Sequence, residues 1–202
     1  MGIYTKKQLS IIVAMVLGDS CVTKFREKRA NSFLTTTHSL KQLEYVKYKM
    51  EKLITLGFKV TRIYDVSREF KSIRFECKDV KLFNQLRKTL YPNNNKTIKR
   101  RWLNYLDDNG LAIWFMDDGS LTKRGKSAYI SLHTNAFNKK EHDIIIKYFK
   151  QVWNLNPTLR VTKRKNSNQT YFLTFNPNET RKFITIIKPY ICKSMYYKVD
   201  FT

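Results

Sequence analysis

The sequence predicts an α+β fold in which one αββαββα unit occurs twice. An apolar, helix-length segment runs into an aspartate near the N-terminus and again past the middle of the 202-residue chain, at Asp19 and Asp118. Each of these segments is followed by strand-like and helix-like segments in the same order, and the two aspartates are 99 residues apart. We therefore expect two pseudo-symmetric halves that pack about an internal twofold axis.

The first half begins with an unusually apolar segment. Residues 11–17 include no polar side chain, so we expect a helix that is buried on all sides. Residues 72–77 alternate between polar and apolar side chains, as in a half-buried strand. In chain order the later elements of this half are strands at 21–29 and 31–39, a helix at 40–58, strands at 59–66 and 71–78, and a helix at 80–91. The helix at 40–58 ends at Gly57, and its apolar face is expected at Leu40, Leu43, Val46, Met50, Leu53 and Ile54.

The second half repeats this order after a polar connector. We divide the chain into an N-terminal half at 1–92, a connector at 93–109 and a C-terminal half at 110–202. The turn-forming stretch PNNNKTIKRR, at 92–101, leads into this connector and forms its first part. The elements of the second half are a helix at 111–118, strands at 120–126 and 127–135, a helix at 138–155, strands at 158–165 and 169–177, and a helix at 179–191.

The two aspartates are expected to lie together. If the two apolar helices pack against each other, the small residues Ala14 and Gly18 allow a close approach, and Asp19 and Asp118 then meet near the axis. A carboxylate is costly to bury without a partner, so this placement favours a metal site. The alternative is that both residues are simply polar helix ends, although a carboxylate is unfavourable at the negative end of a helix dipole.

The charge of the chain indicates a polyanionic partner. It contains 39 Lys and Arg against 16 Asp and Glu, a formal net charge of +23. Nucleic acid is favoured over a membrane, because no apolar run approaches the roughly 20 residues that span a bilayer. Three widely spaced cysteines indicate neither a disulfide framework nor a zinc site. The N-terminus lacks the pattern of a signal peptide, so we expect an intracellular location, in a bacterial or phage-infected cytoplasm or an organelle interior.

The two apolar segments carry a family resemblance. IVAMVLGDS at 12–20 and LAIWFMDDG at 111–119 resemble the two motifs of a single-chain LAGLIDADG homing endonuclease. The resemblance implies a duplicated αββαββα fold whose two antiparallel sheets form a DNA-binding saddle. It also implies a monomer that cuts double-stranded DNA at a long asymmetric target, using Mg²⁺ (or Mn²⁺) and leaving short 3′ overhangs.

The same resemblance assigns roles to single residues. The metal-binding acid of each motif, its eighth letter, falls on Asp19 and on Asp118. Lys96, in NKTIK, and Lys198, in SMYYK, match lysines that lie near the scissile phosphates in similar single-chain members. The resemblance therefore gives four catalytic residues: Asp19, Asp118, Lys96 and Lys198. Two positions depart from the family pattern: Ser20 replaces the final glycine of the first motif, and Asp117 stands where a small residue is usual.

The chemistry of these residues suits phosphodiester hydrolysis. The reaction needs an activated water and neutralised charge on the attacking and leaving oxygens, and carboxylate-held magnesium supplies both. Lysine near the phosphate adds electrostatic stabilisation or helps proton transfer. Lys96 and Lys198 are 102 residues apart and so also follow the repeat, but each belongs to a large pool of cations and is alternatively a solvated surface charge.

Cations cluster in the predicted strands. A β-ribbon with basic residues at every second position suits the major groove of DNA, where most such contacts are to phosphates. We expect about two in three of these residues to contact DNA and the rest to be surface charge. They are Lys24, Arg26, Lys28, Arg62, Arg68, Arg74, Lys123, Arg124, Lys126, Arg160, Lys163 and Arg164.

The aromatic and histidine residues favour no other chemistry. The aromatic residues at helical spacing are expected in the core rather than stacked on bases: Tyr45, Tyr48, Tyr148, Phe149 and Trp153. His38, His133 and His142 are too few and too scattered for a histidine-based nuclease or a zinc cluster.

Two other functions remain open at this point. One is a maturase of the same fold that binds intron RNA and assists splicing. The other is a DNA-binding regulator that has lost the chemistry. Two carboxylates facing phosphates give no advantage to a protein that only binds, so a site-specific DNA endonuclease is the favoured interpretation.

Overall fold

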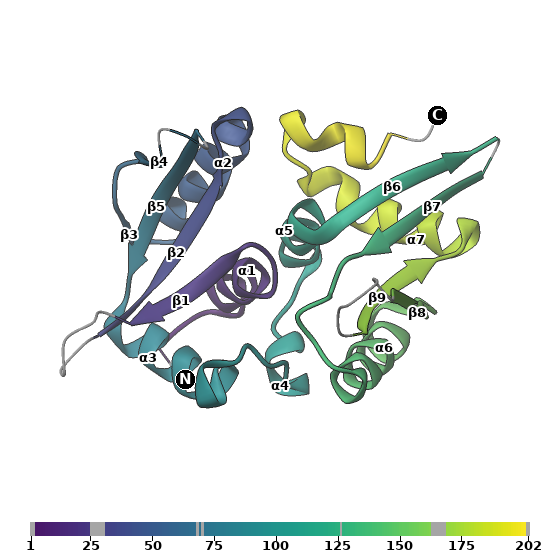
Figure 1. Ribbon diagram of the computed structural model, residues 1–202, viewed down its shortest axis with the longest axis horizontal. Helices are drawn as coiled ribbons and strands as arrows, with labels where there is room; N and C mark the ends of the chain where they lie inside the picture. Colours follow the sequence, from purple (N-terminus) through teal and green to yellow (C-terminus); the bar gives the residue numbers. More distant parts are fainter. Residues whose placement is uncertain are drawn as a thin grey trace.

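A computed structural model describes residues 3–24, 31–67, 69, 71–125, 127–162 and 169–200. It contains two halves, each with one sheet and its own helices, and the two central helices α1 (Lys6–Leu17) and α5 (Asp108–Asp118) lie side by side between them (Figure 1). This arrangement confirms the predicted duplication. None of the described helices is both long enough and apolar enough to cross a membrane.

The first half contains an antiparallel sheet backed by helices. After α1 the elements are β1 (Ser20–Lys24), β2 (Ser32–Ser39), α2 (Leu43–Thr55), β3 (Lys59–Val60), β4 (Tyr64–Ser67), β5 (Ser72–Lys78) and α3 (Val80–Leu90). The strand order is β1-β2-β5-β3, and β4 also pairs with β5. The expected strand at 59–66 is thus two short strands. Ile73, Phe75 and Cys77 of β5 are buried while their neighbours are not, as the alternating pattern predicted.

The second half repeats the first. Its elements are α5, β6 (Gly119–Arg124), β7 (Ser127–Leu132), α6 (Lys139–Trp153), β8 (Thr158–Thr162), β9 (Thr170–Phe175) and α7 (Pro177–Ile187). The strand order β6-β7-β9-β8 is antiparallel throughout, which matches the first sheet. Two short 3₁₀ helices follow, at Lys188–Tyr190 and Lys193–Lys198, and they return the chain to α5 and α2.

The central helices approach closely at both ends. A Cβ added to Gly18 would lie 2.3 Å from Oδ2 of Asp117, and one added to Gly110 would lie 2.2 Å from Oγ of Ser10. Ser10 also donates a 2.6 Å hydrogen bond to Asp107, the N-cap residue of α5. The contacts pair the start of α1 with the start of α5 and the end with the end, so both aspartate-bearing ends face the same way.

Two regions differ from the expectations. The segment 40–58 begins with a 3₁₀ turn at Leu40–Gln42, and Leu40 and Ile54 are exposed rather than part of the core. Val46 and Leu53 are buried as expected, and Leu43 and Met50 are partly buried against the core. The buried face of α2 also includes Tyr45 and Lys49, because this helix turns towards α5 as well as towards its own sheet. The connector contains a short helix, α4 (Arg100–Leu103), and its Ile98, Trp102 and Leu103 are buried.

Candidate active site

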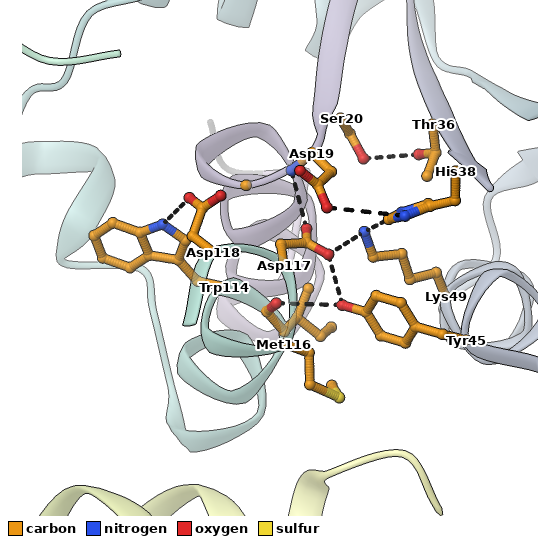
Figure 2. Close-up of polar contacts among 12 residues, drawn as sticks. Asp19, Ser20, Thr36, His38, Tyr45, Lys49, Trp114, Met116, Asp117 and Asp118 are labelled. Atoms are coloured by element: carbon orange, nitrogen blue, oxygen red, sulfur yellow. Dashed lines mark hydrogen bonds and ion pairs between the residues drawn. The ribbon is translucent and has the colours of Figure 1, made fainter. Parts of the chain in front are cut away.

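The two predicted metal-binding aspartates lie at the same end of the central helices but in different settings (Figure 2). Asp19 is two residues past the end of α1, and its side chain is 42% exposed. Asp118 is the last residue of α5 and is half-buried. Its Oδ2 accepts a 3.1 Å hydrogen bond from the indole nitrogen of Trp114, one helical turn earlier.

The environment of Asp118 disfavours its negative charge. The pKa of this carboxyl is raised to about 7, chiefly by burial and then by the nearby charges of Asp117 and Asp19, against opposing effects of Lys96 and Trp114. The effects that disfavour the charged form of Asp118 therefore outweigh those that favour it. A divalent cation would stabilise the charged carboxylates, and carboxylate oxygens are the ligands that Mg²⁺ and Mn²⁺ prefer. The donor set of Asp19 and Asp118 thus fits such an ion.

The two predicted lysines reach the ends of the central helices from different parts of the chain, Lys96 from the connector and Lys198 from the C-terminal half. Nζ of Lys96 donates to the carbonyl oxygens of Leu17 at 2.7 Å and Gly18 at 3.0 Å, at the end of α1. Nζ of Lys198 donates to the carbonyl oxygen of Met116, and at 3.5 Å to that of Asp117, at the end of α5. Each ammonium group therefore satisfies carbonyls at the negative end of one central helix.

Burial lowers the pKa of both Lys96 and Lys198, while the neighbouring aspartates act in the opposite direction. The two lysines thus lie beside the carboxylates, in equivalent positions at the ends of α1 and α5. This placement follows the repeat of the sequence, in which they are 102 residues apart.

Asp117 points away from solvent into the first half. Its side chain is 0% exposed, and Oδ1 accepts from Lys49 at 2.5 Å and from the hydroxyl of Tyr45 at 2.7 Å. Oδ2 accepts a 3.1 Å hydrogen bond from the backbone nitrogen of Asp19. Lys49 in turn lies 3.1 Å from Nε2 of His38, whose Nδ1 is 3.8 Å from Oδ2 of Asp19 (Figure 2).

Asp19, His38 and Asp117 form a cluster in which three candidate ligand atoms lie within 4.8 Å of one another. The contacts of Asp117 argue against its use as a ligand, since both of its oxygens already accept hydrogen bonds and one pairs with a buried ammonium. Asp19 is the exposed member of the cluster. Of the two adjacent acids in the second motif, Asp118 is therefore the better candidate for the metal, as the alignment predicted.

Sequence reasoning did not identify Lys49, Tyr45 or His38 as part of this site. Tyr45 was expected in the core, where it is buried, but its hydroxyl is engaged with Asp117. The available signal was Lys49, which follows Tyr45 by one helical turn on the buried face of α2. Lysine is almost never fully buried without a partner, so a lysine in that position indicates a buried carboxylate nearby.

The structure shows the positions of some of the residues predicted to contact DNA. Arg124 and Arg160 border one hollow of about 470 Å³ on the second sheet, together with Tyr129 and Phe172. This is the sheet face opposite the helices, because the alternate residues of β7, including Ile130, are buried. The hollow therefore combines cations with aromatic side chains on an open face.

The remaining predicted contacts are more scattered. Arg74 of the first sheet donates a 2.9 Å hydrogen bond to Thr37 on β2, and Arg62 and Lys123 are exposed. Lys24 lines a different polar pocket of about 490 Å³ beside α3, so the structure does not bring it to the second-sheet hollow. Six predicted contacts lie outside the described residues: Arg26, Lys28, Arg68, Lys126, Lys163 and Arg164.

Two relatives match nearly the whole chain. A probable intron-encoded endonuclease of Wickerhamomyces canadensis is 28% identical in an alignment 206 residues long, which covers 98% of this chain and 85% of that protein. The cytochrome b mRNA maturase bI2 of Debaryomyces hansenii is 28% identical over 206 residues, with 96% and 74% covered.

Solved structures show the same fold. The homing endonuclease I-WcaI bound to its DNA recognition sequence has a TM-score of 0.76 and 24% identity, over 98% of this chain and 88% of that one. I-DmoI in complex with DNA and Mn has a TM-score of 0.58 and 14% identity, over 90% and 96%. The sequence model of the LAGLIDADG DNA endonuclease family matches residues 9–183.

Proposed function

This chain belongs to the LAGLIDADG DNA endonuclease family, and we propose that it is a homing endonuclease that hydrolyses both strands of a long, asymmetric DNA target and leaves short 3′ overhangs. The observation that carries the proposal is that Asp19 and Asp118 lie at the same end of the paired central helices, close enough for the charge of Asp19 to raise the pKa of Asp118. Lys96 and Lys198 beside them make the site two-sided, as cleavage of two strands requires.

Asp19 and Asp118 are proposed to hold a divalent metal, Mg²⁺ or Mn²⁺. When bound there, the metal would supply a water of lowered pKa and neutralise charge on the attacking and leaving oxygens. The indole of Trp114 orients the carboxylate of Asp118. The I-DmoI complex with DNA and Mn supports divalent metal use in this fold, while the identity of the ion in this chain is our proposal.

Lys96 and Lys198 are proposed to face the two scissile phosphates. Each already holds its ammonium at a helix end, so the charge is fixed in place before DNA arrives. A preorganised cation stabilises charge that develops on the phosphate in the transition state without further rearrangement. The lowered pKa of each lysine also brings it closer to the range in which it can exchange a proton.

The open sheet faces are proposed to bind duplex DNA. Arg124 and Arg160 on the second sheet and Arg74 on the first lie on strands that a DNA duplex can follow, and the net charge of +23 favours its binding. The chain is proposed to act as a monomer inside a cell or organelle, because its second half supplies the partner that a one-motif chain would obtain by dimerising.

A cleavage assay tests this proposal. A plasmid carrying the uninterrupted DNA that flanks the gene should be linearised in Mg²⁺ and remain intact in EDTA. The Asp19→Asn, Asp118→Asn double variant serves as the matched control and should bind this plasmid without cutting it. Failure of the wild-type chain to cut in either Mg²⁺ or Mn²⁺ would contradict the proposed enzyme activity.

The maturase relative favours a second function in RNA splicing. The two functions share the basic sheets but differ in their need for the carboxylates. Binding of the host intron RNA, with splicing that survives Asp19→Asn and Asp118→Asn, would establish the second function. Wild-type DNA cleavage measured in parallel shows whether the chain carries one activity or both.

A further inference from the structure

We propose that Asp117 is a positioning residue for Asp19: its buried carboxylate holds the backbone of Asp19 in place and does not itself bind metal. The inference rests on the proposed function, because it concerns how a metal-binding carboxylate is aligned. It assigns a role to the position at which the second motif departs from the family's usual small residue.

The backbone of Asp19 needs an outside partner. The last hydrogen bond at the end of α1 runs from the backbone nitrogen of Gly18 to the carbonyl of Ala14, so the nitrogen of Asp19 lies past the helix. It donates instead to Oδ2 of Asp117 across the helix pair, at 3.1 Å. Since this nitrogen is directly linked to the Cα that carries the carboxylate, the bond fixes where the side chain of Asp19 starts.

Asp117 is itself held rigidly. Lys49 and the hydroxyl of Tyr45 both donate to Oδ1, and both side chains are fully buried on α2. Gly18 leaves the space that the Asp117 carboxylate occupies, because a Cβ at this position would come within 2.3 Å of Oδ2 of Asp117. The carboxylate therefore connects α2, α5 and the end of α1 at one point.

The two catalytic aspartates are thus held by different means. Asp118 lies within α5, and its carboxylate is oriented by Trp114 of the same helix. The seventh letter of the first motif is Gly18, which has no side chain to hold Asp118 as Asp117 holds Asp19. Outer partners that orient a metal ligand typically contribute about 10-fold to 100-fold in metal affinity or activity.

A pair of double variants isolates the hydrogen bond from the charge. Lys49→Met with Asp117→Asn removes both charges but keeps a side-chain oxygen for the nitrogen of Asp19. Lys49→Met with Asp117→Ala removes the charges and the oxygen. Replacing both members of a buried ion pair avoids leaving one charge unpaired. Lys47→Met, an exposed lysine on the same helix, is the control for loss of positive charge.

Two readouts are needed, one of them without metal. In metal-free protein, NMR measures the rate of hydrogen exchange at the amide of Asp19. This rate should be at least about tenfold faster in the double variant with Asp117→Ala than in the double variant with Asp117→Asn. With bound DNA, the Mg²⁺ concentration for half-maximal cleavage should be about 10-fold to 100-fold higher in the double variant with Asp117→Ala than in the double variant with Asp117→Asn. Equal exchange rates, or equal Mg²⁺ requirements, in the two variants would overturn the proposal.

The wild-type protein gives an independent check. The amide of Asp19 should be protected from exchange although its side chain is 42% exposed, and an unprotected amide would overturn the proposal even if both variants misfold. Wild-type protein that shows this protection but cuts no DNA would instead contradict the proposed function alone.

Discussion

Gly18→Ala places a methyl group where the two central helices meet. The added Cβ would lie 2.3 Å from Oδ2, 2.5 Å from Cβ and 2.8 Å from Cγ of Asp117. Rotation of the Asp117 side chain cannot relieve the contact with its Cβ, and its carboxylate is already held by Lys49 and Tyr45. The only relief is a shift of α5 relative to α1.

The cost of this shift follows from the packing. Overpacking a tight interior typically costs about 1–3 kcal/mol, and three atoms closer than ordinary contact place this substitution at the upper end, about 3 kcal/mol. For a chain of this size each kcal/mol lowers the melting temperature by about 2–4 °C. We therefore expect a decrease of about 6–12 °C. Cleavage should also slow at temperatures where the variant remains folded, since the shift separates Asp19 from Asp118.

Thermal unfolding followed by circular dichroism measures the effect, with Gly57→Ala as the control. Gly57 has φ +84° and no atom within 4 Å of an added Cβ, so its substitution tests backbone strain without a collision. That control should cost about 1–2 kcal/mol. If Gly18→Ala shifts the melting temperature by less than the control, the close helix contact described above is wrong.

Four further predictions concern the proposed activity. Asp19→Asn or Asp118→Asn should abolish cleavage of both strands with little loss of DNA binding, because both carboxylates are expected to touch a common central metal; strand-labelled nicking assays in which either variant cuts one strand normally would refute this. Lys96→Met and Lys198→Met should each slow single-turnover cleavage by about 100-fold while binding persists, and unchanged rates would limit both lysines to capping the helix ends. DNA affinity should fall with salt with a log-log slope of about −7, as for about 8 neutralised phosphates, whereas a slope near about −2 would place most of the charge off the interface. Because the pKa of Asp118 is raised to about 7, protons should compete with the metal for this carboxylate below that pH. Calorimetry should therefore show weaker Mg²⁺ binding at about pH 6 than at about pH 8. Equal affinities at the two pH values would argue against Asp118 as a ligand.

The repeat, the order of helices and strands along the chain, and the burial of the central helices could all be predicted because they depend on local patterns. A segment with no polar face has to be buried, and residues 72–77 alternate as a half-buried strand must. The positions of Asp19 and Asp118 followed from these patterns together with the motif. Lys96 and Lys198 could be placed because NKTIK and SMYYK resemble family segments, and both lysines do lie at the ends of the central helices.

The exposure of Ile54 and the burial of Lys49 could not be predicted in the same way. Both depend on how α2 is rotated, and that rotation is set by a partner elsewhere in the chain. Tyr45 and Asp117, which meet in this cluster, are 72 residues apart and lie in different halves. No local periodicity encodes such a pairing, so it becomes visible only when both halves are assembled.

The Asp117 contact makes the two halves of this chain non-interchangeable. Motif alignment sets Gly18 and Asp117 opposite each other across the pseudo-twofold axis. A homodimer of second halves would bring two copies of Asp117 together without Lys49, and two buried like charges would repel each other. A homodimer of first halves would leave each Lys49 buried without its carboxylate. A chimera that keeps this N-terminal half therefore needs an acid at the position of Asp117 in its new C-terminal half. This requirement restricts which C-terminal halves can be combined with this N-terminal half to build new DNA specificities.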